Sequence, residues 1–143
     1  MSNSFLYIPE ILTRKKVIEL INSNSFTTSL VIQKTCDSGA TVGDIVMYTT
    51  TNDENVDVST TNDDIRPSIG IIIEKVDPTT AKIMIMGEFN GASGLTPGNK
   101  IFLSTTGSLT STPPTVDYLQ CMGVAISTTK FLFSPQIQRV KRI

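Results

Sequence analysis

The stretch 87–133 constrains the fold of this chain more than any other. Leu95–Gly98 predicts a turn, because Pro97 fixes one φ angle and Gly98 tolerates a positive one. Pro113 and Pro114 then exclude a helix and a central strand. Between segments dense in Gly, Pro, Ser and Thr lie short apolar runs that predict strands: Lys100–Ser104, Met122–Ser127 and Lys130–Phe133. This composition is typical of a β-domain and contains no pattern that suggests chemistry.

Alternating or apolar runs outside this stretch also predict short strands. The clearest hairpin surrounds the Pro-containing turn 77–80, and the uninterrupted apolar run Ile71–Ile73 predicts burial on both faces of its sheet. The other expected strands are Thr28–Thr35, Ile45–Thr50, a brief one at Val56 and Val58, Ser68–Val76 and Ala81–Gly87. About eight short strands with regular turn signals indicate a mainly β fold, an antiparallel β-sandwich or barrel.

One amphipathic helix is expected ahead of the strands, from Ile11 to about Asn24. Its apolar face carries Leu12, Val17, Leu20 and Ile21. A surface helix that covers one end of the sheet and an arm that docks on a neighbouring subunit both fit this pattern. The expected organisation is an N-terminal arm and helix (1–26), a β-domain (27–135) and a basic C-terminal tail (136–143).

The C-terminal tail alternates basic and apolar residues. Arg139, Lys141 and Arg142 interleave with Ile137 and Val140. Such alternation is typical of an edge strand whose lysines and arginines guard against unwanted pairing. It also fits an arm laid across an acidic surface of a partner. The candidate docking residues are therefore Arg139, Lys141 and Arg142, together with the apolar face of the expected helix.

Composition excludes several classes of function. Only 17% of the 143 residues are charged and the net charge is −1, so no basic field is available to bind nucleic acid. No apolar run approaches the ~20 residues that span a bilayer, and no signal peptide is recognised. The chain has no histidine, the usual general base and the commonest metal ligand. We expect no enzyme activity, no cofactor and no contact with nucleic acid or membrane.

Two short motifs resemble fragments of catalytic sites. Gly91–Gly94 lacks the following helix and the histidine that a nucleophile elbow needs, so a loop is expected. Ser127 and Lys130 match S-x-x-K but lie between two expected strands, where we expect a turn. Cys36 and Cys121 are far apart in sequence, which favours two free thiols, although a disulfide remains open.

An acidic loop follows the second expected strand. It contains Asp53, Glu54, Asp57, Asp63 and Asp64. Ca²⁺ takes six to eight oxygen ligands, but the spacing of an EF-hand loop is not met. A solvated acidic rim is the leading interpretation, and a structural cation site is the alternative.

An ordered set of motifs gives the chain a family resemblance. In sequence they are Gly43-Asp44-x-Val46, Ile69–Ile72, Gly94–Gly98, Phe102–Ser104, Gly107–Thr110, Pro113-Pro114 and Gly123-Val124-Ala125-x-Ser127-x-Thr129. Over residues 40–134 the chain resembles the β-domains of tailed-bacteriophage virion proteins, particularly capsid decoration and head- or tail-fibre proteins. The resemblance implies a non-enzymatic structural protein mounted on a capsid or tail, often as a homotrimer, and it carries over no catalytic residue.

Two functions are therefore expected. The first is a virion structural protein, a capsid decoration or head-fibre component, assembled in the cytoplasm of a bacterial host. Its partners would be a capsid or tail protein of the same virion and further copies of itself, with a trimer favoured. The alternative is a tail-associated module that binds a receptor or glycan through loops 50–66 and 105–118, with Tyr48 and Tyr118 as exposed aromatics.

Overall fold

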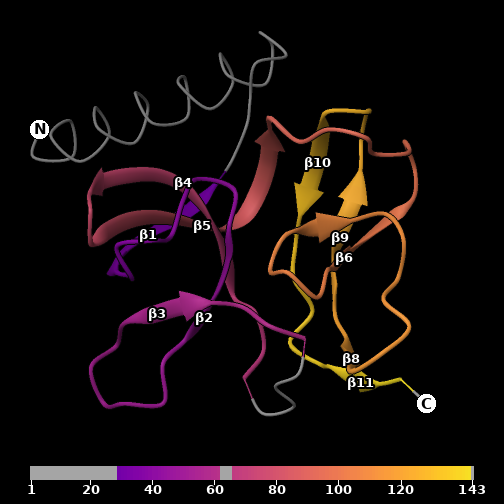
Figure 1. The fold of residues 1–143 in the computed structure, drawn as a ribbon. Coiled ribbons are helices and arrows are strands. Elements are labelled where there is room, and N and C mark those ends of the chain that lie inside the picture. The colour runs from indigo at the N-terminus through magenta and orange to yellow at the C-terminus, as the bar shows by residue number, and fades with distance from the viewer. Residues whose placement is uncertain (1–28, 62–65, 143) are drawn as a thin grey trace, which may run out of the picture.

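The described part of the chain is mainly β and contains no helix. The computed structural model describes residues 29–61 and 66–142, so the expected helix and its apolar face lie outside the described residues. The strands are β1 (Leu30–Thr35), β2 (Ile45–Tyr48), β3 (Val56–Val58), β4 (Gly70–Asp77), β5 (Thr80–Asn90), β6 (Lys100–Leu103), β7 (Leu109–Thr110), β8 (Tyr118–Leu119), β9 (Cys121–Ala125), β10 (Lys130–Phe133) and β11 (Val140–Lys141) (Figure 1). The prediction of a mainly β chain is confirmed.

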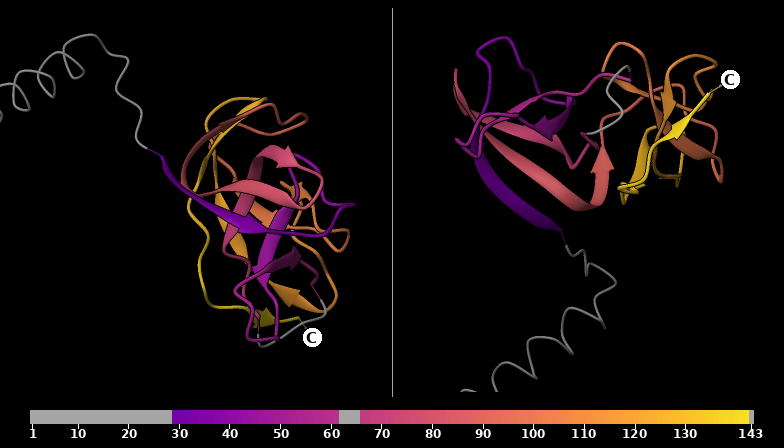
Figure 2. Two further views of the ribbon diagram at one scale, coloured as in Figure 1. Left: turned by 90° about the vertical axis from the view of Figure 1, so that its left-hand side faces the viewer. Right: turned by 90° about the horizontal axis from the view of Figure 1, so that it is seen from below.

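Strand β5 connects the whole sheet. Its first part, Thr80–Met84, pairs with β4 on one edge, and Thr80–Met86 pairs with β1. Its last part, Gly87–Asn90, pairs with β10. The sheet runs in the order β3-β2-β4-β5-β10-β9-β6-β7, with β1 added on β5, and these strand pairs are antiparallel. We call β1 to β4 with the start of β5 the β4 side, and β6, β7, β9 and β10 with the end of β5 the β10 side (Figure 2).

A bend at Gly87 allows one strand to serve both sides. Its φ is +147°, a conformation that favours glycine, and a Cβ there would lie 3.1 Å from the Cα of Ser29. Before the bend Met84 belongs to the larger core cluster, and after it Phe89 packs against the same cluster. Alternate residues of a regular strand share a face, so the odd spacing of these two shows that β5 rotates at the bend.

The β4 side curls into a half-barrel. Cys36, just after β1, forms a bridge with Val56 of β3 and donates its N–H to the carbonyl of Thr79 at 2.9 Å. Lys75 also stabilises the curled shape of the half-barrel. Its ammonium group donates to the carbonyls of Ala40 at 2.9 Å and Pro78 at 2.8 Å. The expected sandwich or barrel is thus a curled antiparallel sheet.

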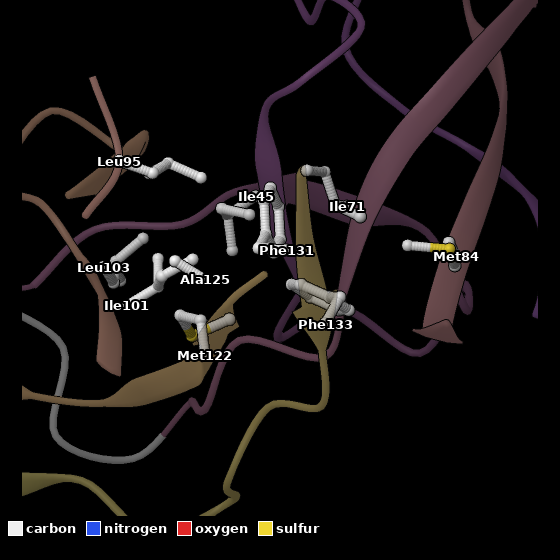
Figure 3. Packing of buried hydrophobic residues seen from close by; sticks show 10 residues of the cluster. All are labelled: Ile45, Ile71, Met84, Leu95, Ile101, Leu103, Met122, Ala125, Phe131 and Phe133. Atoms are coloured by element: carbon white, nitrogen blue, oxygen red, sulfur yellow. The ribbon is translucent and has the colours of Figure 1, made fainter. Parts of the chain in front are cut away.

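Two clusters of buried side chains lie on opposite faces of this sheet. The larger cluster fills the space between the two sides and contains Ile45, Ile71, Met84, Leu95, Ile101, Leu103, Met122, Ala125, Phe131 and Phe133 (Figure 3). The smaller cluster lies inside the half-barrel and contains Cys36, Ala40, Val46, Val56, Ile72, Ala81 and Ile83. Ile71 and Ile72 are both buried and belong to different clusters, which confirms that this hairpin is buried on both faces.

The turn between β6 and β7 closes the larger cluster from the β10 side. The carbonyl of Gly107 accepts the N–H of Ile45 at 3.3 Å, so the tip of the turn bonds to β2. Gly107 has a φ of +85°, and a Cβ there would lie 2.8 Å from the carbonyl oxygen of Ser59. Only glycine combines this conformation with so close an approach.

Gly107→Ala is expected to lower the free energy of unfolding by about 2–4 kcal/mol, because backbone strain and overlap with the Ser59 carbonyl add together. Gly98→Ala is the matched control: its φ is +83° and a Cβ there meets nothing within 4 Å. Gly98→Ala should lower the free energy of unfolding by about 1 kcal/mol, because it introduces backbone strain without an overlap. Urea unfolding measures both, and equal losses would contradict the proposed contact.

Candidate docking site

The structure describes only the C-terminal part of the expected docking residues. Leu12, Val17, Leu20 and Ile21 lie outside the described residues. Lys141 and Arg142 are exposed, whereas Arg139 is half-buried. The basic residues of the tail therefore do not form one uniform surface.

The guanidinium group of Arg139 is bound within its own chain. Its Nε donates to the Oε1 of Gln120 at 2.9 Å, and its Nη1 donates to the carbonyl of Thr60 at 2.6 Å. Its Nη2 donates to the Oγ of Ser68 at 3.1 Å. These bonds join the tail to two loops that are distant in sequence. The docking prediction for the tail consequently rests on Lys141 and Arg142.

Gln120 lies at the centre of this network and is 1% exposed. Besides accepting from Arg139, its Oε1 accepts the N–H of Ser68 at 2.9 Å. Its Nε2 donates to the carbonyls of Ser68 at 2.9 Å and Gln136 at 2.6 Å. The amide thus makes all the hydrogen bonds of which it is capable. A buried polar group that makes all its hydrogen bonds stabilises the fold, whereas a buried polar group without hydrogen-bond partners would destabilise it.

The rest of the tail follows the body of the protein. Strand β11 pairs with β8, so that Val140 lies opposite Leu119 and Lys141 opposite Tyr118. The N–H of Arg142 donates to the carbonyl of Asp117 at 2.7 Å. Within residues 136–142, Val140 and Lys141 form the strand β11, which lies beside β8 close to the C-terminus (Figure 1). Lys141 and Arg142 are exposed.

The described acidic residues of loop 50–61 bind within the chain. Asp53 accepts from the hydroxyl of Thr49 at 2.6 Å, the hydroxyl of Thr51 at 2.5 Å and the N–H of Asn55 at 3.0 Å. These bonds lower the pKa of Asp53 from 3.8 to about 2, with Thr49 the largest cause. Asp57 pairs with Arg66 at 3.1 Å.

The cation-site alternative has no support among the described residues. In residues 29–61 and 66–142 no group of three or more Asp, Glu, Cys or His side chains is placed to hold a metal ion. Glu54 pairs with Lys34 at 3.3 Å. Asp63 and Asp64 lie outside the described residues.

The two fragments of catalytic motifs form connections between strands, as predicted. The Oγ of Ser127 accepts the N–H groups of Thr129 at 3.2 Å and Lys130 at 3.0 Å, so it caps the turn between β9 and β10. Gly91 begins a loop that is held by bonds from the N–H groups of Gly91 and Ala92 to the carbonyl of Thr129, each 3.1 Å long.

The two cysteines are free thiols, which is the interpretation that the sequence favours. Cys36 and Cys121 are both free; the first is buried and the second is half-buried. Across residues 29–61 and 66–142, the structure contains no helix with the length and hydropathy needed to cross a membrane.

Three surface features could contact a partner. An apolar depression of about 250 Å³ is lined by Tyr48, Ile69, Ile85, Met86, Pro135 and Ile137. An open groove of about 370 Å³ runs along residues 104–116 and is lined mainly by Ser, Thr and Pro side chains. On the outer face of the β10 side, Val124, Ile126 and Leu132 are 42%, 46% and 44% exposed.

Comparison with known proteins identifies no family: no protein-family model matches the chain, and no curated protein matches it in sequence.

Gln120→Leu is expected to lower the free energy of unfolding by about 2–4 kcal/mol, because the buried N–H and carbonyl of Ser68 each lose a hydrogen bond and Arg139 loses one of its several bonds. Gln138→Leu is the control, since Gln138 is exposed, and it should cost less than about 0.5 kcal/mol. Chemical unfolding of the two variants beside the wild type checks this. A similar small loss in both would show that the network does not fasten the tail.

The Asp53 carboxyl should titrate near pH 2. A lowered pKa in the folded state stabilises the ionised form, so its contribution is complete above pH 3.8 and is lost as the pH falls from 3.8 towards 2. Thr49→Val removes the largest cause and should raise this pKa, whereas Thr49→Ser keeps the hydroxyl and should change it little. Carboxyl NMR titration measures all three proteins, and identical pKa values would refute the assignment.

Proposed function

We propose that this chain is a structural protein of a bacteriophage virion, a capsid decoration or head-fibre component without enzymatic activity. It would assemble in the bacterial cytoplasm and contact a capsid or tail protein of the same virion. Self-association as a homo-oligomer, for which the resemblance favours a trimer, belongs to the same proposal.

The ordered set of turn and strand motifs between residues 40 and 134 carries this proposal. These motifs occupy the strands and turns that surround both core clusters, including Pro97–Gly98 before β6 and the Gly107 turn before β7. Their similarity to virion β-domains therefore concerns the central part of the fold. The low charged fraction of 17% agrees with a protein that works against other protein surfaces.

The two ends of the chain are the proposed attachment elements. Lys141 and Arg142 project from β11 and the residue after it, held in place by the Arg139 and Gln120 network. The apolar residues Leu20 and Ile21 belong to the segment that precedes β1. Such a protein stabilises a shell by bridging neighbouring capsomers, and burial of apolar area supplies most of the free energy.

One observation favours the alternative of a tail-associated receptor- or glycan-binding module. The groove along residues 104–116 offers the hydroxyl groups of Ser104, Thr105, Thr110, Thr112 and Thr115 within the loop expected to make contact. Tyr48 is 40% exposed beside the other loop, whereas Tyr118 is half-buried. Sugar recognition usually needs an exposed aromatic face, and the groove residues include none.

Particle association tests the proposal. Phage particles should carry the chain through gradient purification, and mass spectrometry should find it in a fixed ratio to the major capsid protein. Lys141→Glu with Arg142→Glu, and separately Leu20→Asp with Ile21→Asp, should reduce binding about tenfold or more. Lys82→Glu, at a half-buried lysine of β5 outside the tail, is the control for reversal of a single charge.

Circular dichroism should show that all these variants remain folded. A wild-type protein that stays monomeric and never joins a particle would contradict the proposal. Specific binding on a glycan array, combined with absence from capsids, would favour the alternative instead.

A further inference from the structure

Four residues from four neighbouring strands form one row across the β10 side. Glu88 of β5 is paired with Leu132 of β10. Leu132 is paired with Val124 of β9, and Val124 is paired with Lys100 of β6. Residues that are directly paired in a sheet point to the same face, so this row reads acid, apolar, apolar, base from one strand to the next.

The row lies on the outer face of the sheet. Glu88 and Lys100 are exposed, and Leu132 and Val124 are 44% and 42% exposed. Their neighbours along the strands, Phe131 and Ala125, point inward to the larger core cluster. Ile126, which follows the last residue of β9 and is 46% exposed, adds to the exposed apolar residues here.

The charges at the two ends of the row are little compensated within the described residues. Glu88 pairs with Lys130 at 3.9 Å, and the length of this contact makes it weak. Lys100 makes no ion pair with any residue in the described part of the chain. The row is therefore apolar in its centre and carries one charge of each sign at its ends.

We propose that this row docks on the same row of a second copy of the chain. A two-fold axis parallel to the strands, passing between β10 and β9, reverses the order of the row in the opposing sheet. Glu88 of each copy then faces Lys100 of the other, and Leu132 of each faces Val124 of the other. All four positions of the row are matched, which is the self-complementarity that a two-fold contact requires.

The charges also select the orientation of the two copies. If the axis ran along the row instead, each glutamate would face a glutamate and each lysine a lysine, which like-charge repulsion disfavours. Leu132 and Val124 in the centre of the contact bury apolar area between the two copies. The two ion pairs at the rim fix which strand of one copy faces which strand of the other. A row of four strands spans only about 15 Å, so this contact alone is smaller than a standard interface.

The small size of the contact predicts weak, concentration-dependent dimerisation in solution and stronger pairing where copies are held close together. The inference rests on the homo-oligomer part of the proposed function and not on attachment to a particle. A two-fold contact forms dimers or joins two trimers, since a trimer ring needs a separate head-to-tail surface.

Sedimentation equilibrium over a concentration series tests the pairing with a charge exchange. Glu88→Lys and Lys100→Glu should each weaken the two-fold association about tenfold or more, since two attractive pairs become repulsive. The double variant Glu88→Lys with Lys100→Glu should restore it, because the exchanged row is again self-complementary. Glu74→Lys, which breaks an exposed cross-strand pair with Lys82 on the β4 side, is the matched control and should change nothing.

Methyl NMR supplies a second readout that does not depend on mass. Signals of Leu132 and Val124 should broaden with concentration in the wild type and in the double variant, but not in either single variant. A monomer at every concentration, or a double variant no better than the singles, would overturn the inference. A wild type that joins particles but never pairs in solution would refute this contact alone. A wild type that pairs in solution but never joins a particle would refute attachment to the virion and leave this contact standing.

Discussion

The pairing of β5 with three other strands is the constraint on which the rest of the structure depends. Its first part holds β4 and β1, and its last part holds β10. Because the strand bends at Gly87, Met84 and Phe89 both reach the larger core cluster from either side of the bend. The half-barrel and the β10 side therefore share one strand and one core, rather than meeting as separate layers.

A polar network supplies the second connection between the two sides. Arg139 and Gln120 join the tail to residues 60 and 68, which flank strands of the β4 side. Apolar burial has little directional preference, whereas these bonds require particular partners at particular distances. We infer that the network fixes where the tail leaves the body, and so where Lys141 and Arg142 are displayed.

Local patterns predicted most of the strands but not how they combine. The turn 77–80 and the apolar run at Ile71 and Ile72 were sufficient to predict a hairpin that is buried on both faces, because both signals lie within a few residues. The extension of β5 beyond Gly87 was not predicted, since Glu88 and Asn90 are polar and their partners in β10 are distant in sequence.

The surroundings of the docking residues were likewise not predictable from local sequence patterns. Alternation with Val140 makes Arg139 look like an exposed base, yet its partners come from loops up to 79 residues away in sequence. The sequence feature that could have indicated a buried partner for Arg139 is Gln120, an uncharged polar residue between Leu119 and Cys121 in an otherwise apolar run. Leu12, Val17, Leu20 and Ile21 lie outside the described residues, and their docking role stays a prediction.

Native-state hydrogen exchange tests most directly whether β5 makes the two sides one cooperative unit. We predict that amides of β4, β5, β9 and β10 exchange through the same opening, with a free energy equal to that of global unfolding. Their free energies should also fall together as urea is added. Exchange of β9 and β10 at a clearly lower free energy, while β4 and the start of β5 stay protected, would contradict the account.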